Sequence, residues 1–187
     1  MDAIEALHKR TSYARLVEPV PTPDELEQIF KAALRAPDHA MLRPWHYLLI
    51  QGDARKRLGE LFVAGMQPDS DAQRDKLLNA PLRAPMIIVA AARLQEHPKV
   101  PRIEQISSTA AGVQNMSLAL YALGYASIWR TGPVAFNARI KEGLGLDRGD
   151  EIVGYLYLGT ATLEKRPVPE HNVADYFEAW EKPCNHD

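Results

Sequence analysis

The sequence is poor in cysteine, in net charge and in long hydrophobic runs. One of its 187 residues is a cysteine, Cys184, so no intramolecular disulfide can form, as is typical of a reducing compartment. A net charge of −2 gives no overall positive field for nucleic acid. The longest apolar run, Met86 to Ala92, is too short to span a bilayer. The first residues lack the basic-then-apolar order of a secretion signal. We therefore expect a cytoplasmic protein with no nucleic-acid or membrane partner.

The sequence also lacks the motifs of metal, covalent and dinucleotide sites. Its six histidines are scattered and no paired-cysteine motif accompanies them, so we predict no metal site. No Gly-x-Ser-x-Gly motif occurs and Cys184 lies in a loose tail, so covalent catalysis has little support. Gly143, Gly145 and Gly149 miss the Gly-x-Gly-x-x-Gly pattern, which disfavours a tightly bound NAD in a Rossmann site.

The length and apolar pattern that are present predict a single α+β domain over residues 1–187. Two continuous apolar segments, Pro85–Ala92 and Ile152–Gly159, predict central strands that are covered on both faces. Shorter strands are expected at Tyr47–Ile50 and just before Trp129. Helical spacing of apolar residues predicts helices at Asp2–His8, Asp24–Leu34, Asp53–Met66, Asp69–Asn79, Arg102–Leu123 and Asn137–Leu144. We predict a central mixed β-sheet with helices on both faces.

The longest predicted helix, Arg102–Leu123, would measure about 30 Å. Its middle, Ser107–Gly112, consists of small residues that let another backbone approach closely. A single inward stripe is expected from Ile103, Ile106, Ala110, Val113, Ser117 and Leu120. The helix is either the core of a monomer or a crossing between two subunits, and its length in so short a chain favours the crossing. The tail Leu163–Trp180 carries exposed aromatic residues, so we expect it to pack on the body or on a partner.

Three basic clusters stand at the ends of predicted elements, where backbone N–H groups are free. They are Arg10, Thr11 and Ser12; the loop Arg35 to Arg43, which includes His39; and Trp129, Arg130, Thr131 and Gly132. Each could be a solvated helix end, because cations are favoured there by the helix dipole alone. Phosphorylated ligands also bind such places. A tryptophan in or beside two of the clusters can wall in a flat ring. Together these features suggest a nucleotide-type cofactor.

In order and spacing, these clusters resemble the motifs of the FMN-dependent nitroreductases. That family opens with Arg-Arg-Ser at a helix end, and continues with Ala-Pro-Ser and Gln-Pro-Trp before a strand. It closes with Trp-x-Thr-Gly and a final strand. The matching segments here are Arg10 to Ser12, Ala36 to Asp38, Arg43 to Trp45, Trp129 to Gly132 and Val153 to Thr160. The sequence Ala-Pro-Asp-His at 36–39 is most similar to a compact NAD(P)H nitroreductase branch of the family.

The resemblance implies a nitroreductase-like fold and an intertwined homodimer with two FMN sites shared at its interface. By position, Arg10, Thr11 and Ser12 would hold the FMN phosphate and ribityl chain, Arg35 and His39 would reach in from the other subunit, and Trp129, Arg130 and Thr131 would complete the phosphate end. The chain departs from the family at Ala14, where many relatives have a lysine or arginine, and an arginine follows at position 15. Met41 and Arg43 replace the usual asparagine and glutamine, so contacts to the flavin ring are less defined.

The function implied by the resemblance is that of an oxidoreductase with NADH or NADPH as a transient co-substrate. It would reduce a nitroaromatic, quinone or similar small-molecule acceptor by ping-pong hydride transfer through flavin N5. The flavin would carry the chemistry, and no catalytic residue is assigned; Arg15, Arg35 and His39 are candidates to stabilise negative charge near N1 and O2. The alternatives are a flavin destructase or dehalogenase on the same fold, a non-catalytic FMN-binding or regulatory protein, and a structural dimer without a cofactor.

Overall fold

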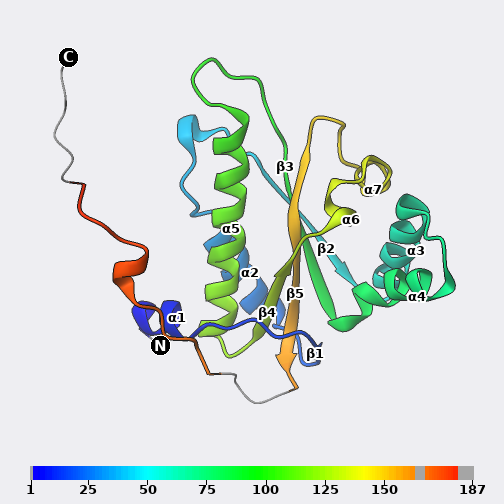
Figure 1. The fold of residues 1–187 in the computed structure, drawn as a ribbon, viewed down its shortest axis with the longest axis horizontal. Helices are drawn as coiled ribbons and strands as arrows, with labels where there is room; N and C mark the ends of the chain where they lie inside the picture. The colour runs from blue at the N-terminus through cyan, green and yellow to red at the C-terminus, as the bar shows by residue number, and fades with distance from the viewer. Residues whose placement is uncertain (1, 163–166, 181–187) are drawn as a thin grey trace.

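The computed structural model describes residues 2–162 and 167–180, which form one sheet with helices on both faces (Figure 1). In chain order the elements are α1 (Ala3–Lys9), β1 (Leu16–Val17), α2 (Pro23–Ala33), η1 (His39–Met41), β2 (Trp45–Gln51), α3 (Ala54–Met66), α4 (Asp71–Asn79), η2 (Ala80–Arg83), β3 (Met86–Ala92), α5 (Arg102–Ala122), β4 (Ala126–Arg130), α6 (Pro133–Phe136), α7 (Ala138–Gly143), β5 (Glu151–Ala161) and η3 (Val173–Asp175). The predicted helices and strands are confirmed, with ends that shift by one or two residues. The sequence analysis missed β1, α6 and the short 3₁₀ turns.

The strand directions correct one prediction. The sheet has the order β1-β5-β3-β2, with β4 also paired to β5, and these four pairings are all antiparallel. Among the described residues, the one parallel contact is an isolated bridge between Ser12 and Ser127. The expected mixed sheet is therefore an antiparallel one. Two helices, α3 and α4, carry the chain away from β2 and back, so that Met86 of β3 starts opposite Gln51 at the end of β2.

Two apolar clusters pack against the two faces of the sheet, because successive strand residues point to opposite sides. Ile88 and Ala90 of β3 face α2 and α5, whereas Ile87 and Val89 face α3, α6 and α7. Every residue of β3 is buried, which confirms the prediction of a strand covered on both faces. The helices α2 and α5 therefore form one layer, with α1 against α5, and α3, α6 and α7 form the other.

The helix α5 is the longest element and buries one face against the sheet. Its buried residues are Gln105, Ser108, Thr109, Gly112, Val113, Met116, Ser117 and Leu120. Ile103 had been predicted to point inward, but its side chain is 65% exposed because it lies in the first turn, beyond the edge of this buried face. The small residues Ser107 and Ala111 lie on the outward side, with Ser107 exposed and Ala111 partly covered. This outward side is open to a second helix.

The start of α2 follows from its sequence. Thr22 caps the helix through Glu25 N–H, and the Glu25 carboxylate accepts in return from the Thr22 N–H at 2.8 Å. This reciprocal capping box satisfies two backbone groups that a helix start otherwise leaves free. The Glu25 carboxylate also accepts a hydrogen bond from the Tyr125 hydroxyl at 2.8 Å, which ties α2 to the turn between α5 and β4.

The described part of the C-terminal tail, residues 167–180, is exposed throughout. Tyr176, Phe177 and Trp180 are 70%, 76% and 78% exposed, so these side chains do not pack on the body of their own chain. The start of the predicted tail, residues 163–166, lies outside the described residues. Within the described ranges, the helices are too short or too polar to cross a lipid bilayer.

Candidate active site

A recess with an aromatic floor lies between the sheet and the helices α3, α4 and α6. It has a volume of about 520 Å³, within the range of small-molecule sites. Its floor is formed by Tyr155 and Tyr157 of β5, and Phe62 packs edge-on against Tyr155 at 5.3 Å between ring centroids. Met66, Leu77 and Val134 add apolar walls. We call this cavity the aromatic recess.

Three cations line the aromatic recess: Lys76 of α4, Arg83 of η2 and Arg130 of β4. The Arg130 guanidinium lies 5.8 Å from the centre of the Tyr157 ring, a cation–π distance. Burial raises the pKa of the Tyr157 hydroxyl, and the charges of Arg130 and Arg83 oppose that rise. The Nε of Arg130 is buried without a hydrogen-bond partner in the described part of the chain. A buried donor of this kind favours an acceptor from a ligand.

A second recess, of about 880 Å³, shares Arg83 with the first. It is lined by Ala14, Arg15, Leu16, Val17, Asn79, Leu82, Arg83 and Thr162, and we call it the arginine recess. No carboxylate occurs among the described residues that line either cavity. The two recesses meet at Arg83 and both are lined by cations, which suits an anionic ligand with a flat, apolar part.

The first basic cluster lies beside the start of β4. Arg10 caps the C-terminal end of α1 through its N–H bond to Ala6 O at 3.0 Å, and Ser12 forms the bridge to Ser127. The Thr11 hydroxyl is buried without a hydrogen-bond partner among the described residues. The chain from Arg10 to Ser12 thus reaches the strand that ends in Arg130, and it leads directly into Arg15 of the arginine recess.

The third cluster is divided by the sheet. Arg130 pairs with Tyr155 and faces the aromatic recess together with Thr131, whereas Trp129 pairs with Leu156 on the α2–α5 side. The indole N–H of Trp129 donates to Val153 O at 3.2 Å, which holds the ring against β5. Gly154 makes room for it, because a Cβ at position 154 would collide with the Trp129 indole nitrogen. Trp129 is therefore not a wall of the aromatic recess.

The second cluster is spread along α5: η1, which contains His39, lies beside the start of α5, whereas α1 lies beside its end (Figure 1). The end of α2, just before Arg35, packs on the middle of α5, where Asn115 donates to Ala32 O. Arg35 is exposed just after α2, and the Nδ1 of His39 lies 2.7 Å from the Glu104 carboxylate in the first turn of α5. The end of α1 lies near Tyr121. The pKa of Lys9 is raised chiefly by the Glu5 carboxylate, and the nearby Tyr121 raises it further. From Glu104 to Tyr121 the helix rises about 25 Å, at ~1.5 Å per residue. Within one chain, Arg10 and His39 are too far apart to touch one small ligand.

Comparison with known proteins decides the family. The sequence profile described as the nitroreductase family matches residues 7–160. This chain belongs to the nitroreductase family of oxidoreductases. It is 42% identical over 166 residues to YdjA of Escherichia coli (strain K12), which is named as a candidate NAD(P)H nitroreductase; the match covers 88% of this chain and 91% of YdjA.

Solved structures of other nitroreductases share the fold. A nitroreductase-like family protein from Bacillus cereus superposes with a TM-score of 0.83 at 25% identity, over 97% of both chains. The FMN-dependent nitroreductase NfnB from Mycobacterium smegmatis, solved in complex with NADPH, superposes with a TM-score of 0.74 at 16% identity. That match covers 95% of this chain and 97% of NfnB. The predicted nitroreductase-like fold is thereby confirmed.

The nitroreductase fold brings residues into the recesses that the sequence analysis did not select. Lys76 lies on α4, which had been predicted as a helix, and Arg83 follows it in the turn that contains Pro81. A lysine on a polar helix carries no sequence signal, since most such lysines are solvated. Tyr155 and Tyr157 were recognised as core strand residues, and the strand alternation that puts both on one face could have indicated a floor.

Proposed function

We propose that this nitroreductase is an FMN-dependent enzyme that uses NADH or NADPH to reduce nitroaromatic, quinone or similar acceptors by a ping-pong mechanism. The observation that carries the proposal is the pair of cation-lined recesses that share Arg83, together with the buried atoms Arg130 Nε and Thr11 Oγ1, which have no hydrogen-bond partner among the described residues. When bound, FMN supplies the redox chemistry, accepting a hydride at N5 and passing electrons on to the acceptor. The single cysteine and the apolar pattern also favour a cytoplasmic location.

The residues present fit this cofactor in its two chemically different parts. The aromatic recess suits the flavin ring, and the arginine recess with Arg10, Thr11 and Ser12 suits the ribityl phosphate. This assignment places Arg130 and Thr131 beside the ring, where the sequence analysis had placed them at the phosphate end. Lys76, Arg83 and Arg130 would stabilise negative charge on the ring, and Arg15 would contact the chain between ring and phosphate.

We further propose that each flavin is shared between two copies of the chain. His39 lies about 25 Å along α5 from the end of α1, so we expect it to reach a flavin held at the Arg10 cluster only from a second subunit. Arg35 follows the end of α2 near the middle of α5, and in this proposal it reaches the same flavin from that second subunit. The outward side of α5, with Ser107 and Ala111, provides a face on which two such helices can pack. A homodimer with two composite FMN sites follows from this arrangement.

The first experiment is an absorbance titration of the purified protein with FMN. We expect a shifted flavin spectrum that bleaches under anaerobic conditions on addition of NADPH or NADH and returns on addition of a nitroaromatic or quinone. A bound flavin that does not bleach would support a non-catalytic binding protein. A flavin that bleaches but does not return would support a destructase, and a protein that binds no FMN would support a structural dimer.

The second experiment tests the shared site with the variants Arg10→Ala and Arg35→Ala. Each removes charge-assisted hydrogen bonds worth about 1.5–3 kcal/mol, so each homodimer should bind FMN roughly tenfold or more weakly. In the heterodimer, one site carries both lesions and the other carries neither. Co-expressed with different tags and assayed at limiting FMN, the heterodimer should recover about half of the wild-type rate.

The exposed Arg148→Ala provides a matched control, because it removes an arginine far from both recesses without losing a hydrogen bond in the described structure. Heterodimers of Arg148→Ala with wild type should be fully active. A heterodimer of Arg10→Ala and Arg35→Ala that is no better than its parents would mean that the two arginines serve the flavin of the same chain, or that one of them does not serve it.

A further inference from the structure

The loop from Asp38 to Arg43 has an unusual backbone. Ala40, Met41 and Arg43 have φ values of 60°, 53° and 52°, and they are three of the four non-glycine residues with positive φ in the described structure. An L-residue adopts this left-handed conformation at a cost, because its Cβ crowds the following carbonyl. Such costs persist where surrounding contacts hold the chain, and they concentrate at functional sites. The loop is therefore held in one conformation by its neighbours.

Three side-chain contacts hold this loop. The Asp38 carboxylate accepts from the Arg43 N–H at 2.7 Å, which closes the loop on itself. The Gln95 amide donates to Leu42 O at 2.8 Å. The Glu104 carboxylate lies 2.7 Å from Nδ1 of His39. Two of these contacts come from outside the loop, and both lead to the first turn of α5.

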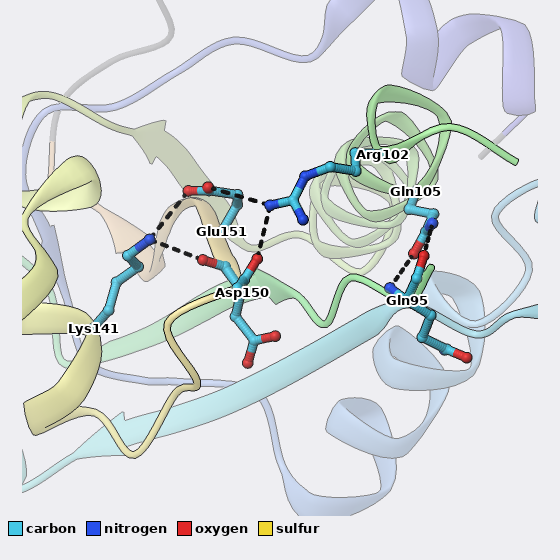
Figure 2. A network of polar contacts seen from close by, with 7 residues as sticks. Gln95, Arg102, Gln105, Lys141, Asp150 and Glu151 are labelled. Carbon is cyan, nitrogen blue, oxygen red and sulfur yellow. Dashed lines mark hydrogen bonds and ion pairs between the residues drawn. The ribbon is translucent and has the colours of Figure 1, made fainter. Parts of the chain in front are cut away.

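The first turn of α5 is a meeting point of several loops (Figure 2). Gln105 and Gln95 form a reciprocal pair, in which each donates to the other at 2.9 Å. Arg102 donates to Gly149 O at 3.0 Å and lies 3.9 Å from the Glu151 carboxylate. Glu104 stands between Arg102 and Gln105 in this turn, and its carboxylate contacts His39. The loop at 38–43 is thus fixed to α5, the element on which the proposed dimer is built.

We propose that Glu104 is a positioning residue that fixes the imidazole of His39 toward the flavin of the partner subunit. The inference rests on the proposed function, in which His39 reaches a flavin held by the second copy. A carboxylate that accepts from Nδ1–H keeps the neutral ring in the tautomer whose Nε2 is free, and it sets the ring orientation. The His39 side chain is 53% exposed, so without Glu104 it would sample several rotamers.

The test compares FMN dissociation constants of Glu104→Ala, Glu104→Gln, His39→Ala and the double variant His39→Ala/Glu104→Ala, measured by flavin fluorescence. Glu104→Ala should weaken FMN binding about two- to fivefold, as expected for the loss of one half-exposed hydrogen bond that orients the ring. Glu104→Gln should restore most of the affinity, because its amide oxygen still accepts from Nδ1–H. The double variant should bind no more weakly than His39→Ala, since Glu104 acts through the histidine.

Two controls separate positioning from general folding. Glu142→Ala removes an exposed glutamate of α7, and Arg102→Ala disturbs the same turn of α5 without touching His39. Neither variant should change FMN affinity, even if Arg102→Ala lowers the midpoint of urea unfolding. If Glu104→Ala fails to fold, the cycle of Glu104→Gln with His39→Ala gives the same comparison, with the two single effects again non-additive.

The proposal is overturned if Glu104→Ala binds FMN as the wild type does, or if its effect adds in full to that of His39→Ala. It is also overturned if Glu104→Gln is as weak as Glu104→Ala, because the hydrogen bond would then not be the cause. A failure of the proposed function would be seen without any of these variants, as a wild-type protein that binds no FMN or an Arg10→Ala variant with unchanged affinity.

Discussion

Gly112 on the inward face of α5 provides the most direct test of how the helix packs. A Cβ at position 112 would collide with the Tyr47 hydroxyl, and it would lie 3.2 Å from Ala33 O and 3.4 Å from Tyr47 Cζ. The Tyr47 ring packs in the cluster between α2, α5 and the sheet, so it cannot swing away freely. The Gly112→Ala substitution therefore sets a collision against the better helix propensity of alanine.

The magnitudes of these two effects decide the sign. Alanine is favoured over glycine in a helix interior by about 1 kcal/mol. Overpacking a well-filled core costs about 1–3 kcal/mol. We expect Gly112→Ala to lower the free energy of unfolding by about 1–2 kcal/mol, because the atom in the way belongs to a rigid aromatic side chain.

The companion variant Tyr47→Phe removes the colliding hydroxyl. That hydroxyl is buried without a partner among the described residues, and burial raises its pKa. Its loss should be neutral or stabilising by up to about 1 kcal/mol, since an unpaired buried polar group is itself costly. In the Tyr47→Phe background the alanine Cβ meets the ring carbon at ordinary contact distance, and the close approach to Ala33 O at 3.2 Å is offset by the helix propensity of alanine, so Gly112→Ala should be close to neutral. The coupling between the two substitutions should be about 2 kcal/mol.

Urea unfolding followed by circular dichroism would measure this cycle, at one fixed chain concentration because association of chains changes apparent stability. Gly149→Ala is the matched control, since a Cβ there has no neighbour within 4 Å. Its effect should be close to zero or slightly stabilising. A Gly112→Ala variant as stable as the wild type, or a double variant that stays as destabilised as Gly112→Ala, would refute the packing argument.

Two further predictions concern assembly and acid stability. Ala111→Phe on the outward side of α5 should split or unfold the dimer by overpacking, whereas a native monomer of the wild type that still holds FMN in sedimentation would contradict the shared site. The pKa of Glu25 is lowered, first by the backbone N–H of Thr22 and then by the Tyr125 hydroxyl, from an ordinary value of 4.5. Its contribution to stability is therefore present above pH 4.5 and lost as the pH falls through the lowered pKa. Glu25→Gln should unfold with a shallower acid dependence than the wild type, and identical acid profiles would count against this assignment.

The sequence predicted those features that depend on local pattern. Buried strands such as β3 are visible as continuous apolar runs, and the capping box at Thr22 marks the start of α2. The motif Ala-Pro-Asp-His selected a loop whose Asp38 does close it through the Arg43 N–H. In each case, neighbouring residues in the chain carry the physical cause.

Features that depend on distant parts of the chain were not predictable. Ala40 and Met41 adopt left-handed backbone without the glycine or asparagine that normally signals it, because contacts from Gln95 and Glu104 hold the loop. Lys76 lines the aromatic recess because α4 packs on α3, and its neighbours in the sequence, Asp75 and Leu77, do not indicate this position. The antiparallel pairing of β2 and β3 likewise depends on the path of the chain through α3 and α4, which returns it to the end of β2. No pattern of residues in the sequence indicates this path.

The length of α5 has a consequence for how cofactor supply and assembly depend on each other. A flavin that contacts both ends of this helix can do so only by joining two chains, so its binding energy is also association energy. By thermodynamic reciprocity, the factor by which FMN would tighten the proposed dimer equals the factor by which dimerisation would tighten FMN binding. Scarcity of the cofactor would then lower the assembled fraction of the protein, and dilution of the protein would release the cofactor.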